Sequence, residues 1–275
     1  MKSSPFLIGL TITHLLNGLM HAMFGFWTPV YQSVMVSPLY CIEVVWPNIF
    51  AATFQLLPLF LALAALERLL ALANPIWFRN HCKPFHLWLV TAFTFLCGLL
   101  SMGINWIMAI FNSNHFISGA CVVPQVVGGS YTIYAIHLLA VAGGICATIS
   151  SGIGVVLGRK KILKMPANSE AEMNRIKKHT KLATCMLMIS VIDLIFVVLP
   201  NIVLILYNTG KLHFPLRDTA YAIIIYSLDS VLNISAYILF NSEFRKSSIN
   251  ALRCGTAVVQ KVTVNVAILT SENRK

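Results

Sequence analysis

Residues 43–68 read EVVWPNIFAATFQLLPLFLALAALER, and this stretch decides the fold. Residues 44–66 hold no charged side chain, and the run ends at the pair Glu67-Arg68. A bilayer core needs about 20 consecutive apolar residues per spanning helix, so the stretch is long enough to cross a membrane. Backbone groups in hydrocarbon must bond to one another, which predicts a continuous helix over residues 43–66.

Further runs of the same kind occur along the chain. The six runs are residues 5–27, 43–66, 85–110, 131–157, 182–207 and 219–240. They are too long for the strands of a membrane barrel, and their apolar residues do not alternate. We therefore predict an all-α fold, a transmembrane helical bundle of six spans within residues 1–253, followed by a cytoplasmic tail over residues 254–275.

The composition of the whole chain agrees with a lipid environment. Of its 275 residues, 57% are hydrophobic and 11% are charged, and the mean hydropathy is +0.78. Soluble domains usually carry roughly 25% charged residues, so lipid is the solvent that this composition predicts. The net charge of +11 does not indicate nucleic acid as a partner, because the basic residues lie in the gaps between the apolar runs.

Lysine and arginine are distributed unevenly between the two sides of the predicted membrane. Eighteen of the 20 lie before the first run, after the sixth, or in the gaps after the second and the fourth, which all face one side. Cytoplasmic loops are enriched in these residues, so we place both termini in the cytoplasm. A cleavable signal peptide is the alternative for residues 5–27, but this run contains His14 and Asn17 and lacks an A-x-A site.

Cysteines sort by side in this topology. Cys41 and Cys121 are the two of seven that fall outside the cell. An oxidising exterior allows them to pair, and two free thiols are the alternative. Cys254 follows a short amphipathic stretch at the membrane surface, where S-acylation and a plain cytoplasmic thiol both fit the sequence.

Two short motifs stand near the inner ends of two runs. Glu67-Arg68-Leu69 follows the second run, and Asn233-Ile234-x-x-Tyr237 lies in the last. Together with the pair of outer cysteines, they resemble a rhodopsin-like G-protein-coupled receptor. Within that family, the stretch Pro75-Ile76-Trp77-Phe78-Arg79 and the loop pattern are most similar to the nematode chemosensory receptors of serpentine class sx.

The resemblance implies a seven-helix receptor fold without its first helix. Residues 5–27 align with the second helix of the family, and His14 stands where the family has an aspartate. Ile234 replaces the proline of the seventh-helix motif. Residues 242–253, which include Phe244, match the short amphipathic helix that follows it, and such a helix lies flat on the membrane.

By the same resemblance, the residues for G-protein coupling and switching are Glu67, Arg68, Asn233 and Tyr237. Arg68 would pair with Glu67 at rest and turn toward a heterotrimeric G protein on activation. The residues alone leave a simpler alternative open, in which Arg68 anchors its span by reaching to the interface.

Polar residues in the last run share one helix face. These residues, spaced by three and four, are Tyr226, Asp229, Asn233 and Tyr237. An ionisable group in lipid usually faces the bundle interior and has a partner, so we expect a buried pair of His14 and Asp229. Two separately satisfied polar groups are the alternative. Asp193 is a further buried acid, for which the sequence names no partner.

A ligand site is expected in the outer half of the bundle. Helical steps back from Arg68 place an acid and several aromatic residues on one face of the second run. Pockets between helices are mostly apolar with a few polar anchors. We therefore predict a cavity for a small extracellular molecule near Glu43, Trp46, Phe50 and Tyr226, with ordinary aromatic packing as the alternative for each.

No signature of an enzyme, a metal site or a cofactor site stands in the sequence, since P-loop, H-E-x-x-H, C-x-x-C and G-x-S-x-G patterns are absent. We expect a chemosensory-type receptor of the plasma or ciliary membrane. Its expected partners are the lipid bilayer, a heterotrimeric G protein and a small molecule. The alternatives are a small solute carrier or channel subunit, and a non-signalling truncated relative of these receptors.

Overall fold

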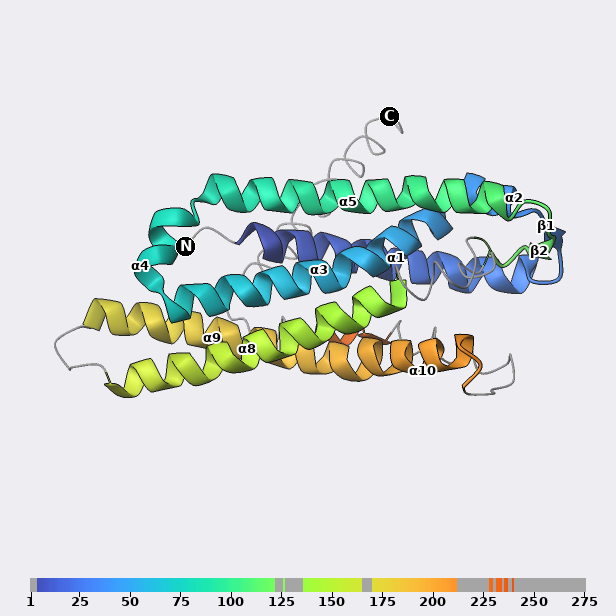
Figure 1. Ribbon diagram of the computed structural model, residues 1–275. Helices are drawn as coiled ribbons and strands as arrows, with labels where there is room; N and C mark the ends of the chain where they lie inside the picture. The colour runs from blue at the N-terminus through green and yellow to red at the C-terminus, as the bar shows by residue number, and fades with distance from the viewer. Residues whose placement is uncertain are drawn as a thin grey trace, which may run out of the picture. The chain divides into compact units, whose positions relative to one another are not determined.

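The computed structural model describes residues 4–121, 126, 136–164 and 170–211, together with 228, 229, 231–233, 235, 236 and 239. The elements are almost all helices (Figure 1). In chain order they are α1 (Pro5–Tyr31), β1 (Met35–Val36), α2 (Pro38–Glu43), α3 (Val45–Ala73), α4 (Pro75–His81), α5 (Pro84–Phe111), β2 (Ile117–Ser118), α8 (Leu138–Lys164), α9 (Glu170–Asp193), η2 (Leu194–Val198, a π-helical turn) and α10 (Leu199–Asn208). All contacts given below lie within the unit Met1–Asn233.

The helices confirm the prediction of an all-α helical membrane bundle. Five helical stretches among the described residues are long and apolar enough to span a membrane: Pro5–Tyr31, Trp46–Ala73, Pro84–Phe111, Leu138–Lys164 and Glu172–Leu206. The sixth predicted span, residues 219–240, lies mostly outside the described residues, and the amphipathic helix, residues 242–253, lies entirely outside them. Both stay predictions.

The second predicted span differs from the structure at its start. Val44 is extended (φ −76°, ψ 128°), so α3 begins at Val45 and Glu43 belongs to the separate helix α2. The prediction of one helix from Glu43 is therefore wrong. Pro47 explains the break, because it has no N–H to bond the Glu43 carbonyl four residues earlier. The side chain of Asn48 instead donates to the carbonyls of Ile42 (2.7 Å) and Val44 (3.1 Å).

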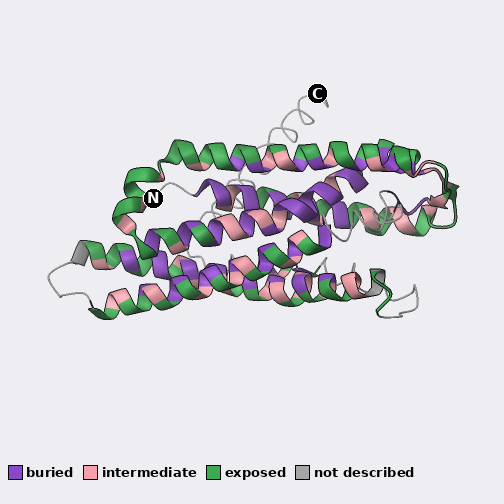
Figure 2. Ribbon diagram, viewed as in Figure 1, coloured by how far each residue is buried: buried purple, intermediate pink, exposed green. Residues whose placement is uncertain are grey.

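Helix α3 is the central helix of the bundle. It packs against α1, α5, α8 and α9. In its most apolar stretch 67% of the residues are buried, against 22% for α5. Figure 2 shows the same contrast, with α3 largely buried and α5 exposed along one side. The exposed side chains of α5 are mostly apolar, which is the surface that lipid covers.

Glycines on α8 let two neighbouring helices approach closely. A Cβ added to Gly143 would lie 2.6 Å from the Pro58 Cβ on α3, and one added to Gly144 would collide with Val198 of η2. Small residues are common where membrane helices meet, because they let backbones pack closely. Helix α8 therefore packs closely on α3 at Gly143 and on η2 at Gly144.

The last long helical stretch among the described residues contains a π turn just before a proline. α9, η2 and α10 follow one another without a loop, and η2 is a π turn just before Pro200. Proline cannot donate to the carbonyl four residues earlier and clashes with it, so the backbone widens at this point. Asn201, the residue after Pro200, accepts a hydrogen bond of 2.5 Å from His137. Its side-chain amide donates to the Val197 carbonyl at 2.8 Å.

A disulfide joins the loops at one end of the bundle, which we call the disulfide end. Cys41 and Cys121 are bonded, which confirms the expected pair. Beside it, β1 and β2 pair antiparallel, with Met35 opposite Ser118. Trp27 of α1 donates its indole N–H to the Gly119 carbonyl at 2.9 Å. The segment after α5 is thus tied to both α1 and α2.

A larger side chain at Gly143 tests the close helix contact. We expect Gly143→Leu to lower the free energy of unfolding by about 1–3 kcal/mol, because overpacking forces the Pro58 backbone away. Gly152→Leu is the matched control, since a Cβ at Gly152 meets no atom within 4 Å. Thermal unfolding of the purified chain in detergent measures both, and equal midpoints would contradict the contact.

Candidate functional site

Three buried polar side chains meet in the middle of the bundle. The Asn233 amide donates to Asp193 at 2.6 Å and to Asp229 at 3.1 Å. All three residues are at most 7% exposed. Asp229 and Asn233 are one helical turn apart on the same face, as their spacing predicts, while Asp193 comes from the end of α9. We call these three residues the acid cluster.

The Asn233 amide nitrogen bonds one oxygen of each carboxyl group, so the two carboxyl groups lie close together. A hydrogen bond between two carboxyl groups needs a proton on one of them, because carboxylates have acceptors only. Two like charges this close in a buried site are also unfavourable, as in the paired acids of aspartic proteases. The pair is therefore best described as one carboxylate and one carboxylic acid that share a proton.

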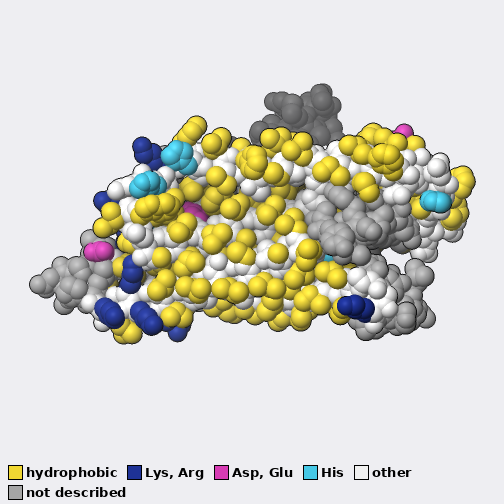
Figure 3. Space-filling view, viewed as in Figure 1, with side chains coloured by type: hydrophobic (Ala, Val, Ile, Leu, Met, Phe, Trp, Pro, Cys, Tyr) yellow, Lys and Arg dark blue, Asp and Glu magenta, His cyan; other side chains and the backbone are white. Residues whose placement is uncertain are grey.

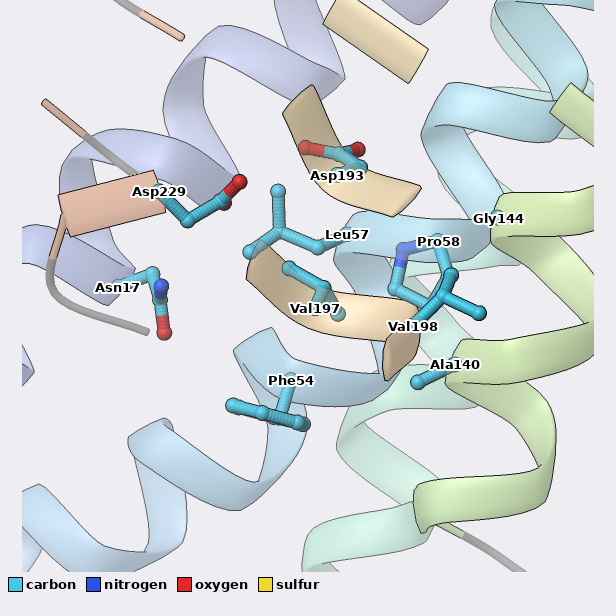
Figure 4. A pocket seen from close by; sticks show the side chains of 10 residues that line it. All are labelled: Asn17, Phe54, Leu57, Pro58, Ala140, Gly144, Asp193, Val197, Val198 and Asp229. Atoms are coloured by element: carbon cyan, nitrogen blue, oxygen red, sulfur yellow. The ribbon is translucent and has the colours of Figure 1, made fainter. Parts of the chain in front are cut away.

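A small cavity adjoins the acid cluster. Its polar lining residues, Asn17, Asp193 and Asp229, gather at one side, and apolar side chains such as Phe54 and Val197 form the other walls (Figure 4). The space open to the centre of a water molecule is about 20 Å³. That is room for about one water, whose hydrogen bonds the polar side would supply, and too little for an organic ligand.

The structure does not form the expected pair of His14 and Asp229. His14 is 2% exposed, and neither ring nitrogen has a hydrogen-bond partner among the described residues. Asp229 accepts a hydrogen bond from Asn233 instead. Sequence reasoning found Asp193 by its charge in an apolar run, but the chain alone gives no distance between two separate helices.

The ion pair of Glu67 and Arg68 lies near the C-terminal end of α3. It is buried at the end of the bundle where α4 and α8 also end. We call this the basic end. Glu67 and Arg68 are 6% and 4% exposed, and their side chains lie 3.5 Å apart. Ser4, which precedes α1, donates a hydrogen bond to the same Glu67 oxygen. Burial and then the charge of Glu67 raise the pKa of the Cys82 thiol, so this cysteine stays protonated at neutral pH.

Buried charges need partners, because removing one partner leaves an ion without compensation. Glu67 has both a hydroxyl and a guanidinium beside it. His179 of α9 lies within electrostatic reach of Arg68, and one of its ring nitrogens is buried without a partner among the described residues. At the basic end Glu67 is therefore held by Ser4, which precedes α1, and by Arg68 of its own helix.

Aromatic side chains fill the half of the bundle toward the disulfide end. Trp46 is 3% exposed and packs edge-on against Phe24, with ring centroids 5.2 Å apart. Phe50 contacts both His21 and Phe54, at 5.1 Å and 5.5 Å. The indole N–H of Trp46 and Nε2 of His21 are buried without a hydrogen-bond partner among the described residues.

Of the four predicted pocket residues, the structure brings two together. Trp46 and Phe50 lie one turn apart on α3 and join the same apolar cluster. Glu43 is exposed on α2, because the break at Val44 takes it off the shared face. Tyr226 lies outside the described residues, as do Tyr237 and Cys254.

Sequence reasoning missed the tie between His137 and Asn201. Its signal was weak, since His137 is one histidine among eight. Asn201 could have been noticed as a polar residue beside Pro200 in an apolar run, where freed carbonyls need donors.

Paired substitutions test the shared proton of the acid cluster. We expect Asp193→Ala and Asp229→Ala each to lower the free energy of unfolding by about 1–3 kcal/mol, because each removes one of the two acceptors of the buried Asn233 amide. The double variant should lose less than the sum, by roughly 0.5–3 kcal/mol. Asp193→Ala combined with Thr94→Ala is the additive control, since Thr94 bonds the Val90 carbonyl of its own helix. Additivity in both pairs would refute the contact.

The chain matches no known family model and no curated protein sequence.

Proposed function

We propose that this chain is a chemosensory receptor of the rhodopsin-like type, which binds a small extracellular molecule and signals to a heterotrimeric G protein. One observation carries the proposal. A central helix, α3, follows the disulfide of Cys41 and Cys121 at its start and ends in the buried pair Glu67 and Arg68. The same combination underlies the resemblance of the sequence to these receptors.

The proposed topology has six spans, with the N- and C-termini in the cytoplasm and the last span over residues 219–240. The distribution of charge supports it. Figure 3 shows Lys and Arg side chains collected mainly at the basic end. The described cations there include Arg79, Lys83, Lys160 and Lys164. Cytoplasmic loops carry such an excess, so the basic end is the cytoplasmic end of this proposal.

In the proposed mechanism Arg68 is the switch. At rest Glu67 holds it, and Ser4 in turn holds Glu67. Release of Arg68 requires a partner that replaces these contacts, because a guanidinium is not stable unpaired in a buried site. A carbonyl-rich helix end of a G protein α-subunit would supply acceptors there. Asn233 and Tyr237 belong to this proposal as members of the last span.

The ligand site of the proposal is the aromatic half of the bundle. Trp46 and His21 offer a donor and a ring nitrogen that the described residues leave unpartnered, beside the Phe50 ring. A small apolar molecule with one or two polar atoms fits this chemistry. The cavity at the acid cluster is too small for it, so binding must widen the bundle. Glu43 and Tyr226 are proposed only as rim residues.

A reconstituted nucleotide-exchange assay tests the proposed function without knowledge of the ligand. Glu67→Gln should raise basal exchange on a purified G protein by about fivefold or more, since a buried ion pair worth more than about 1 kcal/mol no longer restrains Arg68. Arg68→Ala should abolish exchange, alone or combined with Glu67→Gln. Glu172→Gln is the control, because Glu172 is an exposed acid on α9.

The acid cluster favours a second candidate function, a proton-coupled carrier. Paired buried acids in a membrane bundle mark proton pathways in pumps and transporters. Measurements on the chain reconstituted in liposomes distinguish the two functions. A proton flux that Asp193→Asn abolishes, with no nucleotide exchange for any class of G protein α-subunit, would replace the receptor proposal by the carrier.

Epitope tags on the two termini test the topology. Both tags should become accessible to antibody only after the plasma membrane of intact cells is permeabilised, because the cations hold those ends inside. A tag placed after Asn114 in the loop beyond α5 should be accessible in intact cells. Tags of the two termini on opposite faces would contradict six spans and the receptor proposal with them.

A further inference from the structure

The turn between α4 and α5 exposes an unusual combination of side chains. Ile76 and Trp77 on α4 are 67% and 43% exposed, and Phe85 and Trp88 on α5 are 71% and 50% exposed. Two cations, Arg79 and Lys83, are exposed among them. We call Ile76 to Trp88 the α4–α5 corner. In Figure 3 basic and histidine side chains lie beside apolar ones at this corner.

The rings of the α4–α5 corner are held to its backbone. Trp77 stacks on His81 with centroids 5.0 Å apart and an interplanar angle of 16°. His81 bonds the Trp77 carbonyl at 3.0 Å, and His86 bonds the His81 carbonyl at 2.9 Å. The Trp77 ring is thus held by His81, while Phe85 and Trp88 are exposed on α5 and are not covered by a described element.

The length of α5 places the corner at a membrane surface. The helix has 28 residues, about 42 Å at 1.5 Å per residue, while a hydrocarbon core is about 30 Å thick. Trp88 and Trp106 are about 27 Å apart along the helix, so they match the two interfacial belts where tryptophan collects. Lys83 and α4 precede Trp88 and thus lie at the level of the headgroups.

The charge at this surface is positive and uncompensated in the sequence around it. No Asp or Glu occurs between Arg68 and Ser169. The nearest acid along the chain, Glu67, is buried and already bonded to Ser4 and Arg68. Arg79 and Lys83 therefore face the headgroup layer without a carboxylate of the neighbouring sequence to neutralise them.

We propose that the α4–α5 corner binds anionic phospholipid of the surrounding bilayer, with Arg79 and Lys83 on the phosphate and carboxylate of the headgroup and the exposed rings among the upper acyl carbons. Lipid is the partner that offers both chemistries at this depth, since Ile76 and Phe85 need an apolar neighbour and the two cations need an anion. The inference depends on the membrane bundle and is independent of the receptor proposal.

Fluorescence quenching by brominated lipids tests the site. The full chain, with Trp27→Phe and Trp106→Phe, leaves Trp77 and Trp88 as lipid-facing reporters, because Trp46 is buried at 3% exposure. It is reconstituted in phosphatidylcholine vesicles that contain a minor fraction of brominated phosphatidylserine or, at the same fraction, brominated phosphatidylcholine. Brominated phosphatidylserine should quench more strongly, with a local enrichment of about fivefold for each cation.

Two charge variants decide the outcome. Arg79→Gln/Lys83→Gln should remove the difference between the two brominated lipids. Arg175→Gln/Lys177→Gln removes the same charge from exposed positions on α9, and the difference between the two lipids should remain. Equal quenching by both lipids in the parent chain overturns the proposal. Loss of the difference in both variants also overturns it, because it would indicate a general electrostatic attraction by the basic end. Loss in neither variant overturns it too.

Discussion

Hydrocarbon offers no hydrogen-bond partner, and the interior of this bundle is arranged around that constraint. Most hydroxyl groups in the helices bond the carbonyl one turn earlier on their own helix. This holds for Thr11, Thr13, Thr91, Thr94, Thr148, Thr180, Thr184 and Ser190. Such residues are satisfied before the helices meet. Carboxyl, amide and imidazole groups have further donors or acceptors beyond such a bond, and some of these join different helices, as Asn233 does with Asp193 and His137 with Asn201.

Helix α3 connects the two ends of the bundle. Toward the disulfide end it carries Trp46 and Phe50, in its middle Pro58 packs on Gly143, and at the basic end it presents Glu67 and Arg68. Its contacts with α1, α5, α8 and α9 mean that a shift at one end of α3 must be accommodated by several neighbours. Close-packed interfaces respond to such shifts by moving between discrete arrangements. A helix of this kind is suited to link two surfaces of a membrane.

The membrane class could be predicted from the sequence because lipid selects for length and hydropathy, which a single chain displays directly. The disulfide followed from sorting cysteines by side. The packing faces of the helices were harder to predict, since lipid-facing and core-facing residues are both apolar and leave little periodicity. Polar residues such as Asp229 and Asn233 indicated which helix face points inward, but not which residue they contact. The expected neighbour was His14, and the structure has Asp193 there. The break at Val44 was not predicted although Pro47 lies three residues later. A proline near the start of an apolar run fits either one continuous helix or the first turn of a new helix.

The π turn before Pro200 has a mechanical consequence. A π turn accommodates one residue more than an α turn, so its conversion to α geometry would rotate everything beyond it by about 100° around the helix axis. The side chain of Asn201 would then leave His137, and other residues of α10 would turn toward α8. The hydrogen bond between His137 and Asn201 therefore holds α10 in its observed rotation about the helix axis, since such a rotation would separate the two side chains.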